Sequence, residues 1–232
     1  MMNLLPSRVL ASPLLIRTVP FLVFLLLTFA QSYGGAYGRY WLYLAKTIVG
    51  AWMIWEMRPR VAEMRWKISM EAVVAGVLVF LIWVGWPELF KLAGMKPEIA
   101  MLKSSGPAWN PTQSFGEGFG LAWLFILVRI AGSTLVVPPL EEVFFRSFVY
   151  RYIRNANFES VPLGAFAWIP FLVTSVLFGF EHREWLAGIL AGIVFQGLVC
   201  WKKRLGDAIT AHAVTNFLLG VWVIWKHEWQ YW

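Results

Sequence analysis

Three polar clusters interrupt a largely apolar chain, and their residue types are those that hydrolysis requires. They read PPLEEVFFR at residues 138–146, FGFEH at 178–182 and DAITAHAVTN at 207–216. A carboxylate can take a proton from water, an imidazole can assist that transfer, and an amide can donate to a developing oxyanion. Together the clusters hold the groups that a water-activating hydrolase needs.

Spacing distinguishes the two glutamates of the first cluster. Pro138 and Pro139 predict a helix start, because proline is favoured at the first helical position. Glu142 and Arg146 are then four residues apart on one face, within reach of an ion pair. Glu141 is rotated from Glu142 by about 100°. We therefore predict that Arg146 holds Glu142, and that Glu141 points elsewhere, unpaired, as a general base.

The other two clusters admit a structural interpretation as well as a chemical one. His212 and Asn216 are four residues apart and project from one helix face, with Asp207 expected as the N-cap of that helix. These two side chains can simply join neighbouring helices, and His182 can be a hydrogen-bonded core residue. Likewise, the glutamates can compensate a helix dipole. The chemical interpretation depends on the combination of the three clusters.

A metal centre is the main alternative for the chemistry. The sequence has three histidines and one cysteine, and it contains neither HExxH nor CxxC. Zinc would need Glu141 or Glu142, together with His182 and His212, on three separate helices without diagnostic spacing. We expect no metal or other cofactor, with zinc at Glu141, His182 and His212 as the alternative. Serine or cysteine hydrolysis ranks lower, because no GxSxG occurs and Cys200 has no histidine close in sequence.

The elements that must position these residues are membrane helices. Of 232 residues, 59% are hydrophobic and 15 are tryptophan, and the mean hydropathy is +0.62, far from a soluble composition. A helix needs about 20 apolar residues to cross a hydrocarbon core of about 30 Å. Spans are expected at about 18–33, 39–55, 68–86, 119–137, 162–180, 185–201 and 205–225, with 138–154 as an extra helix or an extension of the fourth. This predicts an all-α bundle of about seven or eight membrane helices around a polar cavity.

The chain is expected to form one integral membrane domain over residues 1–232. Residues 1–118 would be scaffold spans and a loop, and 119–225 the catalytic core. The first span is interpreted as an anchor rather than a signal peptide, because no small-residue cleavage site follows it. Within the spans, Lys46 and Glu71 are expected to snorkel or to form pairs, and Arg129 to neutralise a carboxylate or to join two helices.

Positive charge gathers between the spans and gives a net charge of +7. The clusters are Arg58, Arg60, Arg65 and Lys67; Arg146, Arg151 and Arg154; and Lys202, Lys203 and Arg204. By the positive-inside rule they face the cytoplasm, which puts the N-terminus in the cytoplasm and the C-terminus outside. Clustering between spans indicates membrane topology rather than nucleic-acid binding.

The ordered motifs resemble those of a known family. They are EExxxR, FxxxH and HxxxN, carried by Glu141, Glu142, Arg146, Phe178, His182, His212 and Asn216. In this order across membrane spans they resemble the CPBP family, which contains type II CAAX prenyl endopeptidases and bacteriocin-processing or abortive-infection membrane proteins. The resemblance covers about residues 119–220. The stretches EEVFFRSFVYRY, LVTSVLFGFEH and RLGDAITAHAVTNFLLG are similar to the exosortase-associated bacterial subgroup.

The resemblance implies a CAAX-type intramembrane endopeptidase in the bacterial inner membrane. Glu141 would activate the attacking water with help from His182, and Glu142 would be held near the site by Arg146. The partners would be a membrane-associated peptide or protein substrate and the lipid bilayer, with no nucleic acid. The site is expected in a polar cavity that opens toward the cytoplasmic half.

The resemblance also implies the oxyanion donors. His212 and Asn216 would donate to the developing charge, with Phe178 packed beside the site. For His182 and His212 to lie level, a depth difference on the order of 10 Å must be closed by a short, tilted or broken span. Two non-catalytic alternatives remain. One is a scaffold or substrate-binding component of a protein-sorting or export system, and the other is a transporter or channel subunit that uses these polar residues as a relay.

Overall fold

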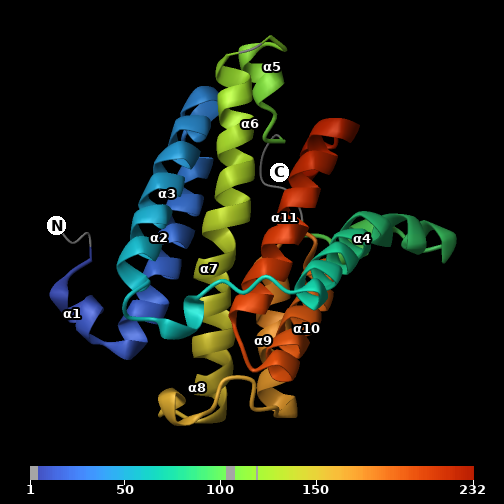
Figure 1. The fold of residues 1–232 in the computed structure, drawn as a ribbon. Helices are drawn as coiled ribbons and strands as arrows, with labels where there is room; N and C mark the ends of the chain where they lie inside the picture. The colour runs from blue at the N-terminus through green and yellow to red at the C-terminus, as the bar shows by residue number, and fades with distance from the viewer. Residues whose placement is uncertain (1–4, 103–107, 119) are drawn as a thin grey trace.

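Regular structure is helical throughout the described part of the chain, so the predicted all-α class is confirmed. The computed structural model describes residues 5–102, 108–118 and 120–232. Around a central helix that begins with α6 lie α2 (Pro13–Ser32), α3 (Gly35–Met57), α4 (Met70–Leu92), α9 (Trp168–Phe180), α10 (Trp185–Lys202) and α11 (Gly206–Lys226) (Figure 1). Shorter pieces are α1 (Ser7–Ala11), α5 (Pro111–Phe115) and the 3-10 turns η1 (Ala62–Met64), η2 (Pro97–Ala100), η5 (Phe158–Ser160) and η6 (Trp229–Tyr231).

In the part of the chain that the structure describes, five helices are long and apolar enough to cross a membrane. They are Pro13–Ser32, Met70–Leu92, Leu121–Arg154, Trp185–Lys202 and Gly206–Lys226. In addition, α3 has 23 residues and α9 is a shorter apolar helix of 13 residues. At about 1.5 Å per residue, α9 is about 20 Å long, too short to cross a hydrocarbon core of about 30 Å by itself. The chain is an integral, multi-pass membrane protein, and its helix count is close to the predicted one.

The central helix runs without a break from Leu121 to Arg154 and carries both glutamates of the EExxxR motif. It consists of α6 (Leu121–Ala131), a π-helical turn η3 (Gly132–Val136), α7 (Val137–Glu142), a π-helical stretch η4 (Val143–Val149) and α8 (Tyr150–Arg154). The predicted helix start at Pro138 and Pro139 is therefore wrong, and the alternative of an extended fourth span is confirmed. A proline ring crowds the carbonyl four residues before it. The wider π-helical turn just ahead of the prolines relieves that crowding and keeps the chain helical.

Small residues let the helices that carry the second and third motifs approach their neighbours closely. A Cβ added to Gly192 of α10 would lie 2.9 Å from the Cα of Ser175 in α9. A Cβ on Gly76 of α4 would lie 2.7 Å from the Cβ of Val214 in α11. Because lipid provides no hydrophobic force between helices, close packing of this kind stabilises membrane bundles. These glycines therefore fix the helices that position the site.

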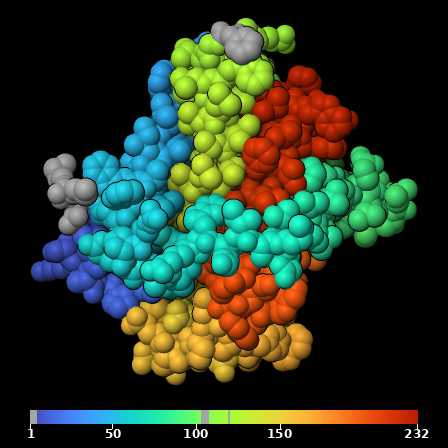
Figure 2. Space-filling model, viewed as in Figure 1, coloured from blue at the N-terminus to red at the C-terminus, as the bar shows by residue number. Residues whose placement is uncertain are grey.

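The basic loops gather at one end of the bundle, as the charge pattern predicts. Lys203 donates to the carbonyl of Gly164, Arg154 donates to carbonyls of the same loop, and Gly206 lies against the backbone of Arg65. The segment that leads from α3 into α4 crosses one face of the molecule, in front of the central helix (Figure 2). Since α9 begins and α10 ends at the basic end, the turn between them points to the opposite end.

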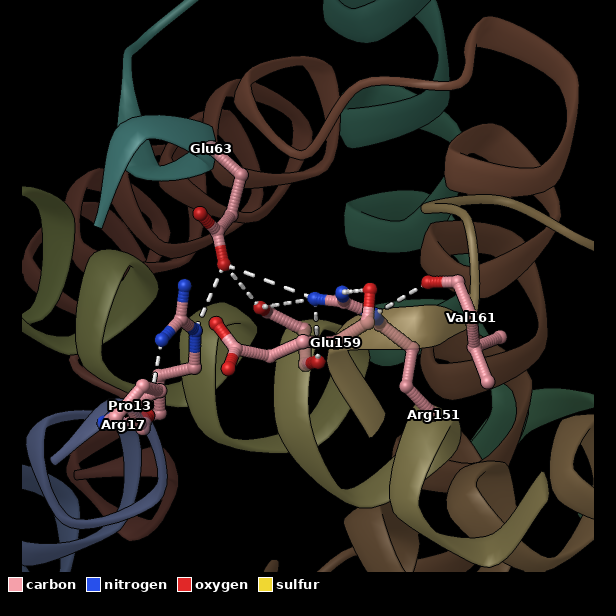
Figure 3. A network of polar contacts seen from close by, with 7 residues as sticks. Pro13, Arg17, Glu63, Arg151, Glu159 and Val161 are labelled. Atoms are coloured by element: carbon pink, nitrogen blue, oxygen red, sulfur yellow. Dashed lines mark hydrogen bonds and ion pairs between the residues drawn. The ribbon is translucent and has the colours of Figure 1, made fainter. Parts of the chain in front are cut away.

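A polar network ties three elements together at the basic end (Figure 3). Glu63 accepts hydrogen bonds from Arg17 Nε at 2.8 Å and from the Ser147 hydroxyl, and Arg151 Nη1 lies 3.9 Å from the same carboxylate. Arg151 also donates to the carbonyl of Val161 at 2.9 Å. Burial raises the pKa of Glu63, but the hydrogen bonds from Arg17 and Ser147 outweigh burial and hold that pKa below its usual value. The ionised carboxylate thus links α2, the loop after α3 and the central helix.

Candidate active site

Glu142 is fixed on two sides by other motif residues. Its Oε1 accepts a hydrogen bond from His212 Nδ1 at 2.9 Å, and its Oε2 lies 3.2 Å from Arg146 Nε, one turn along the same helix. The side chains of Glu142 and Arg146 are fully buried. The predicted ion pair is therefore present. The contact with His212 links helices that are far apart in sequence, so spacing alone could not reveal it.

Glu141 faces another direction, as its rotation from Glu142 predicts. Its Oε2 lies 3.8 Å from His212 Nε2, too far for a hydrogen bond, and has no hydrogen-bond partner among the described residues. The side chain lines a cavity that is also lined by His182 and His212. Both glutamates lie in the middle of the central helix rather than at its N-terminus near Leu121, so the expected compensation of a helix dipole is wrong.

The His212 imidazole is held in one orientation by aromatic rings. Its ring is stacked on Phe195 of α10, with centroids 5.1 Å apart, and meets Phe178 of α9 edge-on at 5.8 Å. Because Nδ1 donates to Glu142, the other ring nitrogen, Nε2, faces Glu141 and the cavity. The imidazole can therefore act toward the cavity through Nε2 alone.

Asn216 lines the cavity one turn beyond His212 and also completes the central helix. In the π-helical turn, the N–H of Val137 bonds to the carbonyl of Gly132, five residues back. The same spacing would pair the carbonyl of Ser133 with Pro138, which has no N–H. Asn216 supplies the missing donor, because its Nδ2 bonds to Ser133 O at 2.8 Å. One Nδ2 hydrogen is used in this way, and the second remains for another acceptor.

His182 lies in the turn after α9 and folds back toward the site. Its Nδ1 donates to the carbonyl of Phe178 at 2.8 Å, and its ring packs 4.8 Å from the ring of Phe178 and 5.3 Å from that of Trp83. Since a carbonyl can only accept, Nε2 of the neutral ring carries the lone pair. The fold-back and the shortness of α9 close the expected depth difference, because Phe178 contacts both His182 and His212.

Phe178 packs at the centre of the cluster, the location that the family resemblance implies. The guanidinium carbon of Arg146 lies 4.0 Å from its ring centroid, a close cation–π contact. None of the three guanidinium nitrogens of Arg146 has hydrogen-bond geometry with a described residue. The charge of Arg146 is therefore met by the Glu142 carboxylate and the Phe178 ring.

A cavity of about 480 Å³ joins the candidate residues. Its lining includes Glu141, Phe178, His182, His212 and Asn216. It continues past Arg129 to the α9–α10 turn (181–184) and to residues 230–232, and none of its lining residues belongs to the basic loops. The cavity therefore extends away from the basic end, and the expected opening toward that side is wrong. The cause is the direction of α9 and α11, both of which run from the basic end to the opposite one.

Other ionisable residues also line this cavity, including Lys46, Arg129, Glu181, Arg183 and Glu184. In the sequence, only its position beside His182 pointed to Glu181 as a site residue. In the structure its Oε2 is buried without a hydrogen-bond partner among the described residues. Lys46 points inward, donates to Thr28 Oγ1 at 3.0 Å and forms no ion pair with a described residue, so it neither snorkels nor pairs as expected. Charge inside a predicted span was the signal for Lys46 and Arg129.

The remaining expectations for polar residues have mixed outcomes. Glu71 forms an ion pair with Lys202 at 2.8 Å. Of the two expectations for Glu71, snorkelling and pairing, the second is confirmed. Asp207 is not an N-cap, because α11 begins at Gly206 and places Asp207 in its first turn. There Asp207 accepts hydrogen bonds from Ser69 and Arg204. It thus joins the start of α4 to the start of α11.

The residues named for a zinc site do not assemble as one. Among the residues that the structure describes, no group of three or more histidine, cysteine, aspartate or glutamate side chains is arranged to hold a metal ion. His212 directs Nδ1 at Glu142, and His182 directs Nδ1 at a backbone carbonyl. In both imidazoles Nε2 is the free nitrogen, as it is in a histidine that binds a metal and donates its other N–H to a carboxylate or a carbonyl, so the orientation of the rings does not by itself decide between metal and metal-free chemistry.

A comparison with protein families matches the segment that contains all three motifs. Residues 121–218 match the family model described as type II CAAX prenyl endopeptidase Rce1-like. Among curated proteins, the probable inorganic carbon transporter subunit DabB of Bacillus subtilis (strain 168) is 28% identical over 103 residues, which cover 44% of this chain and 19% of that protein. The match thus spans about a fifth of the length of that relative. No solved structure matches the chain significantly.

Proposed function

We propose that the chain is an intramembrane endopeptidase that cleaves a membrane-associated peptide or protein, because residues 121–218 match the family model described as type II CAAX prenyl endopeptidase Rce1-like. One observation carries the proposal. Two adjacent carboxylates have opposite surroundings: Glu142 is locked between Arg146 and His212, whereas Glu141 presents an unbonded oxygen to a cavity. A general base needs an unbonded oxygen that faces the cavity, as Glu141 has, and the fixed Glu142 beside it keeps Glu141 oriented.

In this mechanism Glu141 takes a proton from a water molecule whose oxygen attacks the carbonyl carbon of the scissile bond. His182 assists by accepting a hydrogen bond from the water at Nε2. The C–N bond then breaks, and Glu141 returns the proton to the leaving nitrogen.

The oxyanion would be stabilised from α11. His212 donates through Nε2 when protonated on both nitrogens, and Asn216 donates through the second hydrogen of Nδ2. Both groups line the cavity and are held by partners outside it, Glu142 and Ser133. Fixed donors of this kind cost little reorganisation when charge develops.

We propose that no metal takes part. The support is that, among the residues that the structure describes, no group of three or more histidine, cysteine, aspartate or glutamate side chains is arranged to hold a metal ion. Exhaustive chelation followed by an assay is the test. Full activity after chelation would fit this mechanism, and loss that zinc restores would contradict it.

The proposal includes the location of the protein. The expected site is the bacterial inner membrane, with the basic loops in the cytoplasm by the positive-inside rule. The cavity would then be reached from the other side or laterally from the lipid. A cysteine-accessibility experiment on exposed positions in the two ends of the bundle tests this orientation.

A non-catalytic membrane subunit is the second candidate function. The likeness to DabB, described as a probable transporter subunit, supports it. The two candidates differ in one observable, the appearance of new peptide termini. A scaffold binds a partner without producing them.

The deciding experiment uses purified protein in proteoliposomes with tagged bacterial membrane proteins as candidate substrates. Wild type, Glu141→Ala and His212→Ala are compared, with Thr215→Val as a matched control on α11. Cleavage by wild type and control that is lost in the two variants supports the peptidase. Undiminished cleavage by Glu141→Ala would overturn the mechanism.

A further inference from the structure

Lys46 and Arg129 are two cations in the same cavity as Glu141, and the proposed mechanism does not use them. The Lys46 residue is only 5% exposed. Neither side chain forms an ion pair with any residue that the structure describes. A charged side chain without a direct ion-pair partner inside a membrane bundle is costly and usually marks a binding or transport function.

Aromatic rings hold both cations at one place. Lys46 Nζ lies 4.6 Å and Arg129 Cζ 5.0 Å from the centroid of the Tyr43 ring, so a single ring joins the two charges. The Arg129 guanidinium also lies 4.7 Å from the ring of Trp109 and 5.4 Å from that of Trp232. Cation–π contacts orient a guanidinium through its face and leave its N–H edge available to a planar anion.

Arg129 lies at a defined distance from Glu141 along the cavity. Arg129, Ser133, Val137 and Glu141 follow one another at intervals of four residues on the central helix, and all line the cavity. Twelve residues correspond to about 18 Å of helix. An extended peptide covers about 3.3–3.6 Å per residue, so about five residues would span this distance.

We propose that Lys46 and Arg129 form an anion-binding subsite that holds a carboxylate of the bound peptide, with Arg129 about five residues from the bond at Glu141. This inference rests on the proposed peptidase function and assigns part of substrate selection to α3, outside the family match. The carboxylate comes either from a free peptide C-terminus or from an aspartate or glutamate side chain. Arg129 suits a bidentate carboxylate, and Lys46 adds a point charge.

Binding tests the subsite without turnover. The Glu141→Gln variant is titrated in detergent with three fluorescein-labelled octapeptides of alanine and leucine. One has a free C-terminal carboxylate, one a C-terminal amide, and one an amide with a single internal aspartate. Fluorescence anisotropy is expected to give about tenfold tighter binding for at least one carboxylate peptide than for the plain amide, and the tighter of the two identifies the source.

Charge-neutralising variants then locate the effect. Lys46→Met and Arg129→Gln are each expected to remove the tenfold preference. Lys67→Met and Arg58→Gln, at exposed cations outside the cavity, are expected to keep it. Equal affinity of Glu141→Gln for all three peptides would overturn the subsite, and so would absence of binding. An equal loss of affinity for all three peptides in Lys46→Met and Arg129→Gln would also overturn it.

The outcomes separate this subsite from the peptidase itself. Carboxylate-selective binding that depends on Lys46 and Arg129, together with no cleavage by wild type, would leave the subsite standing and remove the peptidase function. Cleavage that depends on Glu141, together with no preference for a carboxylate peptide, would leave the peptidase function standing and remove the subsite. The comparison among peptides needs neither cation variant, so misfolding of those variants cannot hide the answer.

Discussion

Asn216 donates to the carbonyl of Ser133 at 2.8 Å, where the N–H that Pro138 lacks would otherwise be required. The last helix therefore completes the turn of the central helix that leads into the two glutamates. This contact couples the HxxxN motif to the EExxxR motif through the backbone. Asn216 is thus a positioning residue for Glu141 as well as a proposed oxyanion donor.

Replacing Asn216 by alanine should lower both stability and turnover. The orphaned Ser133 carbonyl is expected to cost about 1–3 kcal/mol, and loss of one oxyanion donor should reduce kcat by about a hundred- to a thousandfold. Thermal unfolding in detergent and peptide cleavage kinetics measure the two effects. Thr215→Val is the control, because that hydroxyl bonds to the carbonyls of Gly76 and Ala211 and should affect stability alone. An unchanged kcat in Asn216→Ala would refute the donor role.

Replacing Glu142 by glutamine should destabilise the bundle strongly. Arg146 is fully buried and its ion-pair partner is Glu142, so neutralising the glutamate leaves an uncompensated charge. Removing one partner of a buried pair costs on the order of 3–5 kcal/mol. Glu88→Gln is the matched control, because its pair with Lys91 is mostly exposed and contributes little. Similar unfolding temperatures for the two variants would contradict the anchoring role.

Acid should weaken the network around Glu63. The folded-state pKa of Glu63 lies below its ordinary value of 4.5. The contribution of the ionised Glu63 to the free energy of unfolding is therefore fully present above pH 4.5 and is lost as the pH falls through the lower, folded-state pKa. Glu63→Gln should therefore unfold at a lower temperature than wild type at about pH 6, with the gap closing toward about pH 3. Glu117→Gln, at an exposed position, should follow wild type throughout. A gap that is independent of pH would exclude an ionised Glu63 as its cause.

Two glycines of α10 should respond oppositely to alanine. A Cβ on Gly192 would lie 2.9 Å from the Cα and 3.0 Å from the carbonyl oxygen of Ser175, whereas one on Gly197 would meet nothing within 4 Å. Gly192→Ala should destabilise by about 1–3 kcal/mol through overpacking. Gly197→Ala should be neutral or stabilising by up to about 1 kcal/mol. Equal unfolding temperatures would show that α9 and α10 are less tightly packed than described.

Local spacing predicted those parts of the site that lie on one helix. The four-residue separation of Glu142 and Arg146 was enough to predict their ion pair. The rotation of about 100° between adjacent residues was enough to predict that Glu141 points away from that pair. The contact of Glu142 with His212 joins residues 70 positions apart and depends on how two helices pack. No local pattern records that packing.

The errors have a common physical origin in tertiary structure. Pro138 reads as a helix start, but a π-helical turn and a donor from Asn216 let the helix continue through it. Lys46 reads as a snorkelling residue, but Thr28 and the Tyr43 ring hold it inside. The direction of the cavity follows from how α9 and α11 run through the bundle, which spans alone do not determine.

The most direct test of the central claim is the rate of peptide-bond hydrolysis by Glu141→Gln in proteoliposomes, measured beside its unfolding temperature. Glutamine keeps the shape of the side chain but cannot accept the proton from water. We predict loss of cleavage by at least about a hundredfold, with an unfolding temperature close to that of wild type, because Glu141 Oε2 has no hydrogen-bond partner to lose. Wild-type cleavage rates in Glu141→Gln would contradict the account.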